Sequence, residues 1–386
     1  MQTFDVIVLG LGTMGSFTCL ELARRGLRVA GLDQFSPPHG RGSHSGDTRI
    51  FRIAYAEHPD YVPLAQRAGH LWDQHGLDFR KTLLTRTGML SMGPPNESLV
   101  AGIRTSARTH RLEVETVTPS EIRRRYPAFA PPEEYVGLFE SAAGWVDVNA
   151  SIEGALTACE RSGAHLFLDT PVTGWRERGG RIFIETATGA IETARLVITA
   201  GAWAGAVLSD LHLPFSVRRK TLAWFDPAEP KYFEPGELPV FLFGDRFFYG
   251  FPSIAGQGVK LAIHWEEGIR VPDPSVPVAP AGVKDLAPIV DCASRYLRGL
   301  TNPFGDGRAC VRRAATCLYT MTPDEHFIID HHPNVENVWI AAGFSGHGFK
   351  FAPAIAEALA DLCETGHTGL PIEFLRLGSR FSQNAV

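Results

Sequence analysis

A glycine-rich turn after the first apolar segment constrains the fold of this chain more than any other feature. Residues 6–9 are Val, Ile, Val and Leu, and residues 10–15 read G-L-G-T-M-G, a G-x-G-x-x-G pattern. A segment compatible with a helix follows, and Asp33 ends the next apolar run about 20 residues further on. A strand, a glycine turn, a helix and an acid at the end of the second strand are together typical of dinucleotide-binding domains.

Each glycine of this turn has a separate task in such a domain. Gly10 permits the tight turn, Gly12 lets the backbone approach a pyrophosphate, and Gly15 lets the helix and strand pack closely. An acid at the position of Asp33 accepts a hydrogen bond from a ribose hydroxyl, which favours FAD or NAD over a 2′-phosphorylated cofactor. A glycine-rich turn in an unrelated sheet is the alternative. The dinucleotide contacts that we expect here are Gly10, Gly12, Thr13, Met14, Gly15 and Asp33.

Three apolar runs that end in glycine predict buried parallel strands. They are residues 6–10, 196–201 and 338–343, and a fourth run, residues 27–32, ends at Asp33. Continuous apolar and β-branched runs of this length fit strands that are covered on both faces. If the four share one sheet, their carboxyl ends line one crevice, where open α/β sheets bind ligands.

The intervening segments predict a second, more antiparallel sheet. Residues 83–92, 135–140, 217–225 and 247–264 have β-like patterns with frequent Gly and Pro. Apolar residues at helical spacing predict four helices. We expect these helices at residues 15–25, 61–74, 151–161 and 353–363.

Composition and charge disfavour several classes of partner. The chain has 386 residues and a formal net charge of −5, which does not favour nucleic acid or an anionic membrane. No apolar run approaches the roughly 18 residues needed to span a bilayer, and no cationic segment precedes the first apolar run. The six cysteines show no CxxC and no metal-ligand spacing. We therefore expect a cytoplasmic protein with free thiols and no bound metal.

A long polar loop and four further motifs resemble those of one known family. Residues 43–52 read SHSGDTRIFR, 249–253 read YGFPS, 258–264 read GVKLAIH, 317–330 read CLYTMTPDEHFIID, and 343–351 read GFSGHGFKF. In this order they resemble the family of monomeric sarcosine oxidase and N-methyltryptophan oxidase, which are FAD-dependent amine oxidases. The resemblance covers the whole chain from the first strand to the last helix.

The resemblance implies a mixed α/β fold in two domains. One is a discontinuous Rossmann-like FAD-binding domain, and the other is a mainly antiparallel-sheet, substrate-binding domain. We place the FAD-binding domain at residues 1–80, 150–210 and 318–386, and the substrate-binding domain at residues 81–149 and 211–317.

The resemblance also implies FAD bonded through its 8α-methyl carbon to Cys317. A thiolate attacks that carbon best in a cationic, partly buried setting, to which Arg312 and Arg313 are close enough in sequence to contribute. A small buried core residue is the alternative for Cys317. The remaining cofactor contacts that we expect are Ser43, His44, Thr48, Arg49, Val172, Gly201, Trp203, Gly346, Gly348 and Lys350.

Two cations of the matching motifs are implied to hold a substrate carboxylate. They are Arg52, which can bind a carboxylate bidentately, and Lys350. The alternatives are an internal salt bridge of Arg52, for example with Asp47, and a cofactor or backbone contact of Lys350. Three further residues match family positions that line the substrate cavity, although each also fits a core position: Tyr249, His264 and Tyr319.

The resemblance places Lys260 beside the flavin, where a fixed cation lowers the barrier to oxygen reduction. A solvated strand lysine is its alternative. Ser45 stands where the family has histidine, so we expect altered flavin tuning or substrate preference. The catalytic residues that we expect are Arg49, Tyr249, Lys260 and His264.

The reaction implied is oxidation of a small N-methyl amino acid such as sarcosine, with oxygen as acceptor. Its products are the demethylated amino acid, formaldehyde and hydrogen peroxide. We expect a monomer whose partners are the amine and oxygen. N-methyltryptophan, pipecolate or another amino acid as substrate, a flavin dehydrogenase that uses a different acceptor, and a non-catalytic FAD-binding subunit are the alternatives.

Overall fold

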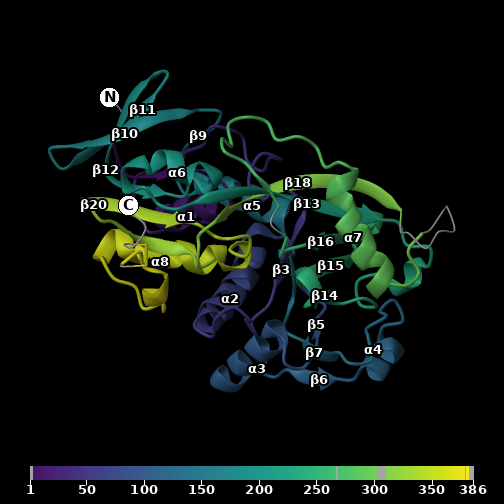
Figure 1. Ribbon diagram of the computed structural model, residues 1–386. Coiled ribbons are helices and arrows are strands. Elements are labelled where there is room, and N and C mark those ends of the chain that lie inside the picture. Colours follow the sequence, from purple (N-terminus) through teal and green to yellow (C-terminus); the bar gives the residue numbers. More distant parts are fainter. Residues whose placement is uncertain (1–2, 267, 302–309, 379, 382–386) are drawn as a thin grey trace.

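The computed structural model describes residues 3–266, 268–301, 310–378 and 380–381. It is a mixed α/β fold with two large sheets, which lie beside one another in Figure 1. A small third sheet accompanies them. Within the described residues, no helix combines the length and apolarity needed to cross a bilayer.

Four parallel strands form the centre of the first sheet. Strand β1 (Thr3–Leu9) pairs in parallel with β2 (Val29–Leu32) and with β12 (Gly189–Ile198), and β12 pairs in parallel with β20 (Val335–Ala342). The prediction that these four runs share one sheet is therefore confirmed. Their carboxyl ends lie at the same edge of the sheet, although they are far apart in the sequence.

Shorter strands extend this sheet on both sides. An antiparallel hairpin continues from β12, β9 pairs with β2, and β19 pairs with β20. These additions were not predicted. Their bounds are β9 (His165–Phe167), β10 (Val172–Arg178), β11 (Arg181–Thr186) and β19 (Ile328–His332).

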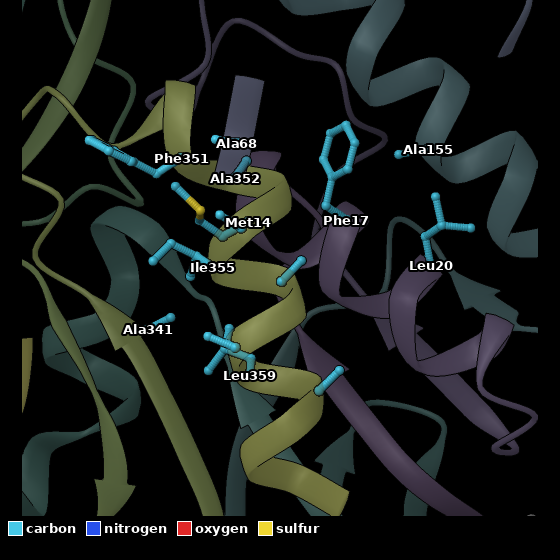
Figure 2. Close-up of a cluster of buried hydrophobic side chains, with 14 of the residues drawn as sticks. Met14, Phe17, Leu20, Ala68, Ala155, Ala341, Phe351, Ala352, Ile355 and Leu359 are labelled. Atoms are coloured by element: carbon cyan, nitrogen blue, oxygen red, sulfur yellow. The ribbon is translucent and has the colours of Figure 1, made fainter. Parts of the chain in front are cut away.

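Helices pack against the first sheet and form the main core with it. In Figure 2, Met14 of α1 lies next to α8, which contributes Ile355 and Leu359, whereas Phe17 and Leu20 lie on the side of Ala155. The five larger side chains are buried, and burial of each stabilises the fold by about 1.5–3 kcal/mol. The predicted helices correspond to α1 (Thr13–Arg24), α2 (Tyr61–Phe79), α5 (Val148–Arg161) and α8 (Ala352–Thr365).

The second sheet is antiparallel except for one pairing, that of β14 with β5. Its strand order is β17-β13-β16-β15-β14-β5-β7-β6, and β18 pairs with β13. The bounds are β5 (Met89–Gly93), β6 (Glu115–Val117), β7 (Val136–Glu140), β13 (Ser216–Phe225), β14 (Val240–Phe243), β15 (Phe248–Ser253), β16 (Val259–Ile263), β17 (Ile269–Arg270) and β18 (Val311–Met321). Helices α3 (Ser98–His110), α4 (Pro119–Arg125), α6 (Ala204–Val207) and α7 (Val283–Tyr296) complete the fold.

One predicted strand segment divides between two sheets. Residues 84–86 form β4 in the small sheet with β3 (Thr48–Phe51) and β8 (Gly144–Asp147), whereas β5 belongs to the second sheet. The chain changes direction at Gly88, whose φ is +75°, a conformation that glycine adopts without strain. The domain boundaries stay a prediction, and β18 runs across the one placed between residues 317 and 318.

Candidate active site

A cleft of about 760 Å³ opens at the carboxyl ends of the parallel strands. Residues at the ends of β1, β2 and β12 line it, including Gly10, Asp33 and Gly201. The β20 end contributes Gly343. The cleft therefore lies where the strand pattern predicted a ligand crevice.

Two glycines of the turn are required by close packing. Gly10 has a φ of +93°, and a Cβ there would lie 2.6 Å from the Thr199 carbonyl oxygen. A Cβ on Gly15 would lie 1.7 Å from the Gly10 carbonyl oxygen. Helix α1 starts beside the cleft without a side-chain cap, so its first N–H groups and its positive end face the space where a phosphate would bind.

Asp33 connects the glycine turn to the segment that follows β2. Its carboxylate accepts hydrogen bonds from the N–H groups of Leu11 (2.7 Å) and Phe35 (2.9 Å). Burial raises its pKa, while both hydrogen bonds oppose that shift. A carboxylate held in this way at the cleft wall suits a ribose hydroxyl.

The polar loop reaches the cleft and is fixed by Arg49. This guanidinium donates to the carbonyl oxygens of Ser43 (2.7 Å), Ser45 (2.6 Å) and Thr48 (2.8 Å). Burial, followed by the charges of neighbouring His39 and Arg49, lowers the pKa of His44 to about 3, so this imidazole is neutral.

The cleft contains most of the cofactor contacts that we predicted. Those that line it are Gly10, Gly12, Thr13, Met14, Asp33, Ser43, His44, Arg49, Val172, Gly201, Trp203, Gly346 and Gly348. Gly15 acts behind the turn, and Thr48, Cys317 and Lys350 lie outside the lining. The uncapped helix end, the two close glycine contacts and Asp33 fit an extended dinucleotide such as FAD.

A second, small chamber of about 70 Å³ adjoins the cleft. Arg49, Tyr319, Gly346 and Phe349 line both cavities. Every predicted substrate-binding residue lines the chamber, namely Arg52, Tyr249, His264, Tyr319 and Lys350. Its apolar wall consists of Ile50, Met89, Leu242, Phe247, Phe251 and Phe349.

Arg52 is paired inside the chamber, but not with the residue that we suggested. Its partner is the Glu57 carboxylate, whereas Asp47 pairs with Arg313. Although burial opposes its ionisation, the charges of Arg52, His347 and Lys350 lower the pKa of Glu57 to about 2. The Arg52 Nη1 atom is buried and has no hydrogen-bond partner among the described residues. Arg52 thus presents a free N–H group beside its ion pair.

Lys350 is the second buried cation of the chamber. Its Nζ donates to the His347 carbonyl oxygen (2.8 Å) and to the Tyr55 hydroxyl (3.3 Å). Burial, and then the charge of Arg52, lower the pKa of Lys350 to about 7. The Tyr55 hydroxyl also bonds His347 Nδ1 at 2.6 Å.

The other titratable groups of the chamber are neutral near pH 7. Burial lowers the pKa of His264 to about 3 and raises that of Tyr249 to about 12. It also raises the pKa of Tyr319, whose hydroxyl lies 3.4 Å from His264 Nδ1. The chamber therefore combines charge at Arg52 and Glu57, and at Lys350 below about pH 7, with uncharged hydrogen-bonding groups.

Lys260 is buried next to the polar loop and not in the lining of either cavity. Its Nζ donates to the Gly46 and Thr48 carbonyl oxygens and to the Thr48 hydroxyl. Burial and the charge of Arg49 lower its pKa well below that of a free lysine. Lys260 is therefore not a solvated strand lysine, which was the alternative for this residue.

Cys317 lies on β18, buried next to Leu222 and Trp224. The two residues that follow it, Leu318 and Tyr319, line the cleft. Burial raises the pKa of the Cys317 thiol, and nearby cations oppose this shift. These cations are Arg49, Lys260 and Lys220.

Arg312 and Arg313, which we expected to contribute, are not among these cations. Arg312 pairs with Asp226, and Arg313 pairs with Asp47. Arg312 lies on the opposite face of β18 from Cys317, and Arg313 lies on the same face, but both side chains are about half exposed. The described residues also contain no cluster of His, Cys, Asp or Glu that would hold a metal.

Several chamber residues were not predicted. Glu57 and His347 join the charge network, Phe247 forms part of the wall, and Tyr55 bonds His347 from outside the lining. An acid five residues after Arg52 was the only available signal for Glu57. The other residues come from segments whose proximity depends on the fold.

The sheet with its dinucleotide cleft, joined to a small cationic chamber, defines a dinucleotide-dependent oxidoreductase. The chain belongs to the family described as FAD dependent oxidoreductase, whose model matches residues 5–362. It is 38% identical to a monomeric sarcosine oxidase of Streptomyces avermitilis over 377 residues, which cover 96% of each chain. It is 34% identical to an N-methyl-L-tryptophan oxidase of Salmonella agona, with 98% of this chain and 100% of that protein covered.

A solved structure of the same fold is that of NikD, described as an unusual amino acid oxidase essential for nikkomycin biosynthesis. The TM-score is 0.84 at 23% identity, and 97% of this chain and 98% of that chain are covered. This likeness supports the fold that the resemblance implied.

Proposed function

We propose that this protein is an FAD-dependent oxidase of a small N-methylated amino acid such as sarcosine. One observation carries the proposal: the buried Nη1 of Arg52, which has no partner in the described part of the chain, lies in the same 70 Å³ chamber as Lys350. Two buried cations with a free donor suit a carboxylate. The relatives are named as oxidases of sarcosine and of N-methyl-L-tryptophan, which supports an N-methyl amino acid as the electron donor.

The size of the chamber favours a substrate without a large side chain. A volume of about 70 Å³ within an apolar wall suits sarcosine better than an amino acid that carries an indole ring. N-methyltryptophan, pipecolate and other amino acids are the alternative substrates. A flavin dehydrogenase with an acceptor other than oxygen is the alternative reaction.

The side chains of the chamber bind the substrate and set its protonation. Arg52 and Lys350 would hold the carboxylate, while Glu57 keeps Arg52 charged and in place. The positive charges of Arg49, Arg52 and Lys350 disfavour a bound ammonium ion, so the amine loses its proton and presents a lone pair. Tyr249, His264 and Tyr319 would exclude water and orient the N-methyl group.

FAD held by the cleft residues would take two electrons from the C–N bond and pass them to oxygen, giving hydrogen peroxide. Water then hydrolyses the resulting substrate imine to formaldehyde and the demethylated amino acid. We propose that Lys260, fixed by Gly46 and Thr48, supplies the positive charge that favours electron transfer to oxygen.

The test of this reaction is an amine panel in an oxygen electrode, with formaldehyde and peroxide measured. We expect sarcosine to be consumed with equal amounts of oxygen, formaldehyde and peroxide, and faster than N-methyltryptophan or pipecolate. Reduction of an artificial electron acceptor without oxygen uptake would instead identify a dehydrogenase. No turnover of any amine would overturn the proposal.

We further propose that the flavin is bonded to Cys317. Arg49, Lys260 and Lys220 supply the cationic setting that favours a thiolate. After acid denaturation and removal of small molecules, flavin absorbance should stay with the wild-type polypeptide and leave that of Cys317→Ser. Cys292→Ser is the control, because Cys292 is buried in the separate core around α7. Flavin released from the wild type would refute the bond but not the fold.

A further inference from the structure

A third cavity, of about 520 Å³, adjoins the chamber at His264, which lines both. We call it the vestibule. It lies between β13, the end of β18 and the segment that follows β16. Its polar lining includes Lys220, Glu266, Thr322 and Glu325.

Side chains that line the vestibule contact side chains that line the chamber. Phe247 lines the chamber and Trp265 lines the vestibule, and their rings are stacked with centroids 3.7 Å apart and planes inclined by 25°. Nearby, His347 of the chamber bonds through Nε2 to the carbonyl oxygen of Glu325 in the vestibule at 3.0 Å. The stack is therefore one element of a thin shared wall.

The backbone under the inner ring is strained. Arg246 and Phe247 are consecutive non-glycine residues with φ of +54° and +51°. L-residues rarely adopt this conformation, and such strain concentrates at ligand clamps and switch regions. Two hydrogen bonds hold the turn, from His264 N–H to Phe247 O (3.1 Å) and from Trp265 N–H to Arg246 O (2.9 Å).

The two rings of the stack differ in freedom. Phe247 is 3% exposed, whereas Trp265 is 44% exposed. The backbone that carries Trp265 is fixed, because buried Lys220 donates to the carbonyl oxygens of His264 (3.0 Å) and Glu266. The indole can thus rotate into solvent while its backbone stays in place.

We propose that the Phe247–Trp265 stack is a gate between vestibule and chamber, and that Trp265 limits the size of the amine that is oxidised. With the indole in place, only a small amino acid passes. With the indole removed, the vestibule and chamber merge and accept an N-methyl amino acid with a larger side chain. The size limit narrows the substrate of the proposed function and therefore rests on that function. The gate itself would act on any carboxylate ligand.

The charges of the vestibule suit a zwitterion. Lys220 attracts the carboxylate, and Glu266 and Glu325 attract the ammonium group. An amino acid that enters by this route meets both signs of charge before it reaches the cations Arg52 and Lys350. The vestibule therefore favours the same class of ligand, an amino acid, as the chamber does.

The test uses the flavin-loaded full chain with Trp265→Ala. Acetate entry is followed by stopped-flow absorbance of the flavin, a readout that needs no turnover. We expect the association rate constant of acetate to rise several-fold. We also expect the ratio of kcat/KM for N-methyltryptophan to that for sarcosine to rise about tenfold or more. Trp265→Phe keeps a ring on the stack and should stay close to the wild type.

The control is Leu77→Ala, which removes another exposed apolar side chain, on α2 and away from both cavities. If Trp265→Ala still oxidises sarcosine but changes neither the acetate rate nor the substrate ratio, the gate is refuted and the proposed function stands. If the wild type oxidises no amine, the proposed function fails, and the acetate rates alone decide whether the gate exists.

Discussion

The dinucleotide cleft and the amine chamber share a wall but are built in different ways. The cleft, about 760 Å³, follows the ends of parallel strands, and glycines bring its backbone close to the ligand space. The chamber, about 70 Å³, depends on the charges of buried Arg52 and Lys350 and of partly buried Glu57. A substitution that adds atoms should therefore impair the cleft most, whereas a substitution that removes a charge should impair the chamber most.

The largest effect should come from Gly15→Ala. The new Cβ would lie 1.7 Å from the Gly10 carbonyl oxygen, so the turn and α1 must separate. We expect purified protein with little or no flavin, measured by the ratio of flavin to protein absorbance. The control Gly40→Ala adds the same atom in open space, with no atom within 4 Å. Full flavin content in Gly15→Ala would show that the cleft tolerates added volume.

Loss of charge in the chamber should act on the substrate and spare the cofactor. In Lys350→Met we expect normal flavin content and a KM for the amine raised about 10- to 150-fold, as for loss of a charged hydrogen bond worth about 1.5–3 kcal/mol. Flavin titration and steady-state kinetics measure the two effects. A loss of flavin instead of substrate affinity would favour the alternative role of Lys350 as a cofactor contact.

The same lysine should give acetate binding a characteristic pH dependence. Burial and Arg52 lower the pKa of Lys350 to about 7, so it is charged below that pH and loses its charge above it. Acetate affinity should therefore fall as the pH rises through this region. Bound acetate favours the charged form and shifts the midpoint upwards. Spectral titration of the wild type should show this decrease, and Lys350→Met should not.

The smallest effect should come from the exposed pair that supports Lys260. Arg313 bonds Asp47, which lies between the two residues whose carbonyl oxygens hold Lys260. Exposed pairs contribute at most about 1 kcal/mol, so Arg313→Gln should slow flavin reoxidation by less than about fivefold. Mixing the reduced enzyme with oxygen measures this rate. Arg312→Gln, whose partner is Asp226, is the control and should have no effect.

The contrast between the two cavities also explains what the sequence predicted. The cleft depends on local signals, because each strand that ends in glycine, and the strand that ends at Asp33, can be predicted from its own short segment. The chamber depends on proximity in space. Asp47 and Glu57 are each five residues from Arg52, and only the path of the chain after β3 decides that Glu57 is the partner. Local patterns do not contain that path.

Local sequence patterns also fail to assign some strands to the correct sheet. Residues 83–92 have one continuous β-like pattern, yet a reversal at Gly88 divides them between two sheets. The Phe247–Trp265 stack joins residues on either side of two strands, β15 and β16, and no local pattern marks it. Family motifs supplied most of the chamber residues, but not the contacts between them.

The central place of β20 in the first sheet has a consequence for synthesis of the protein. Strand β1 emerges from the ribosome before its neighbour β12, and β12 pairs with β20, which is synthesised later still. At roughly 5–20 residues per second, β20 appears on the order of tens of seconds after β1. The nascent chain lacks a complete cleft throughout that interval, so a full set of cofactor contacts forms only after β20 has been synthesised.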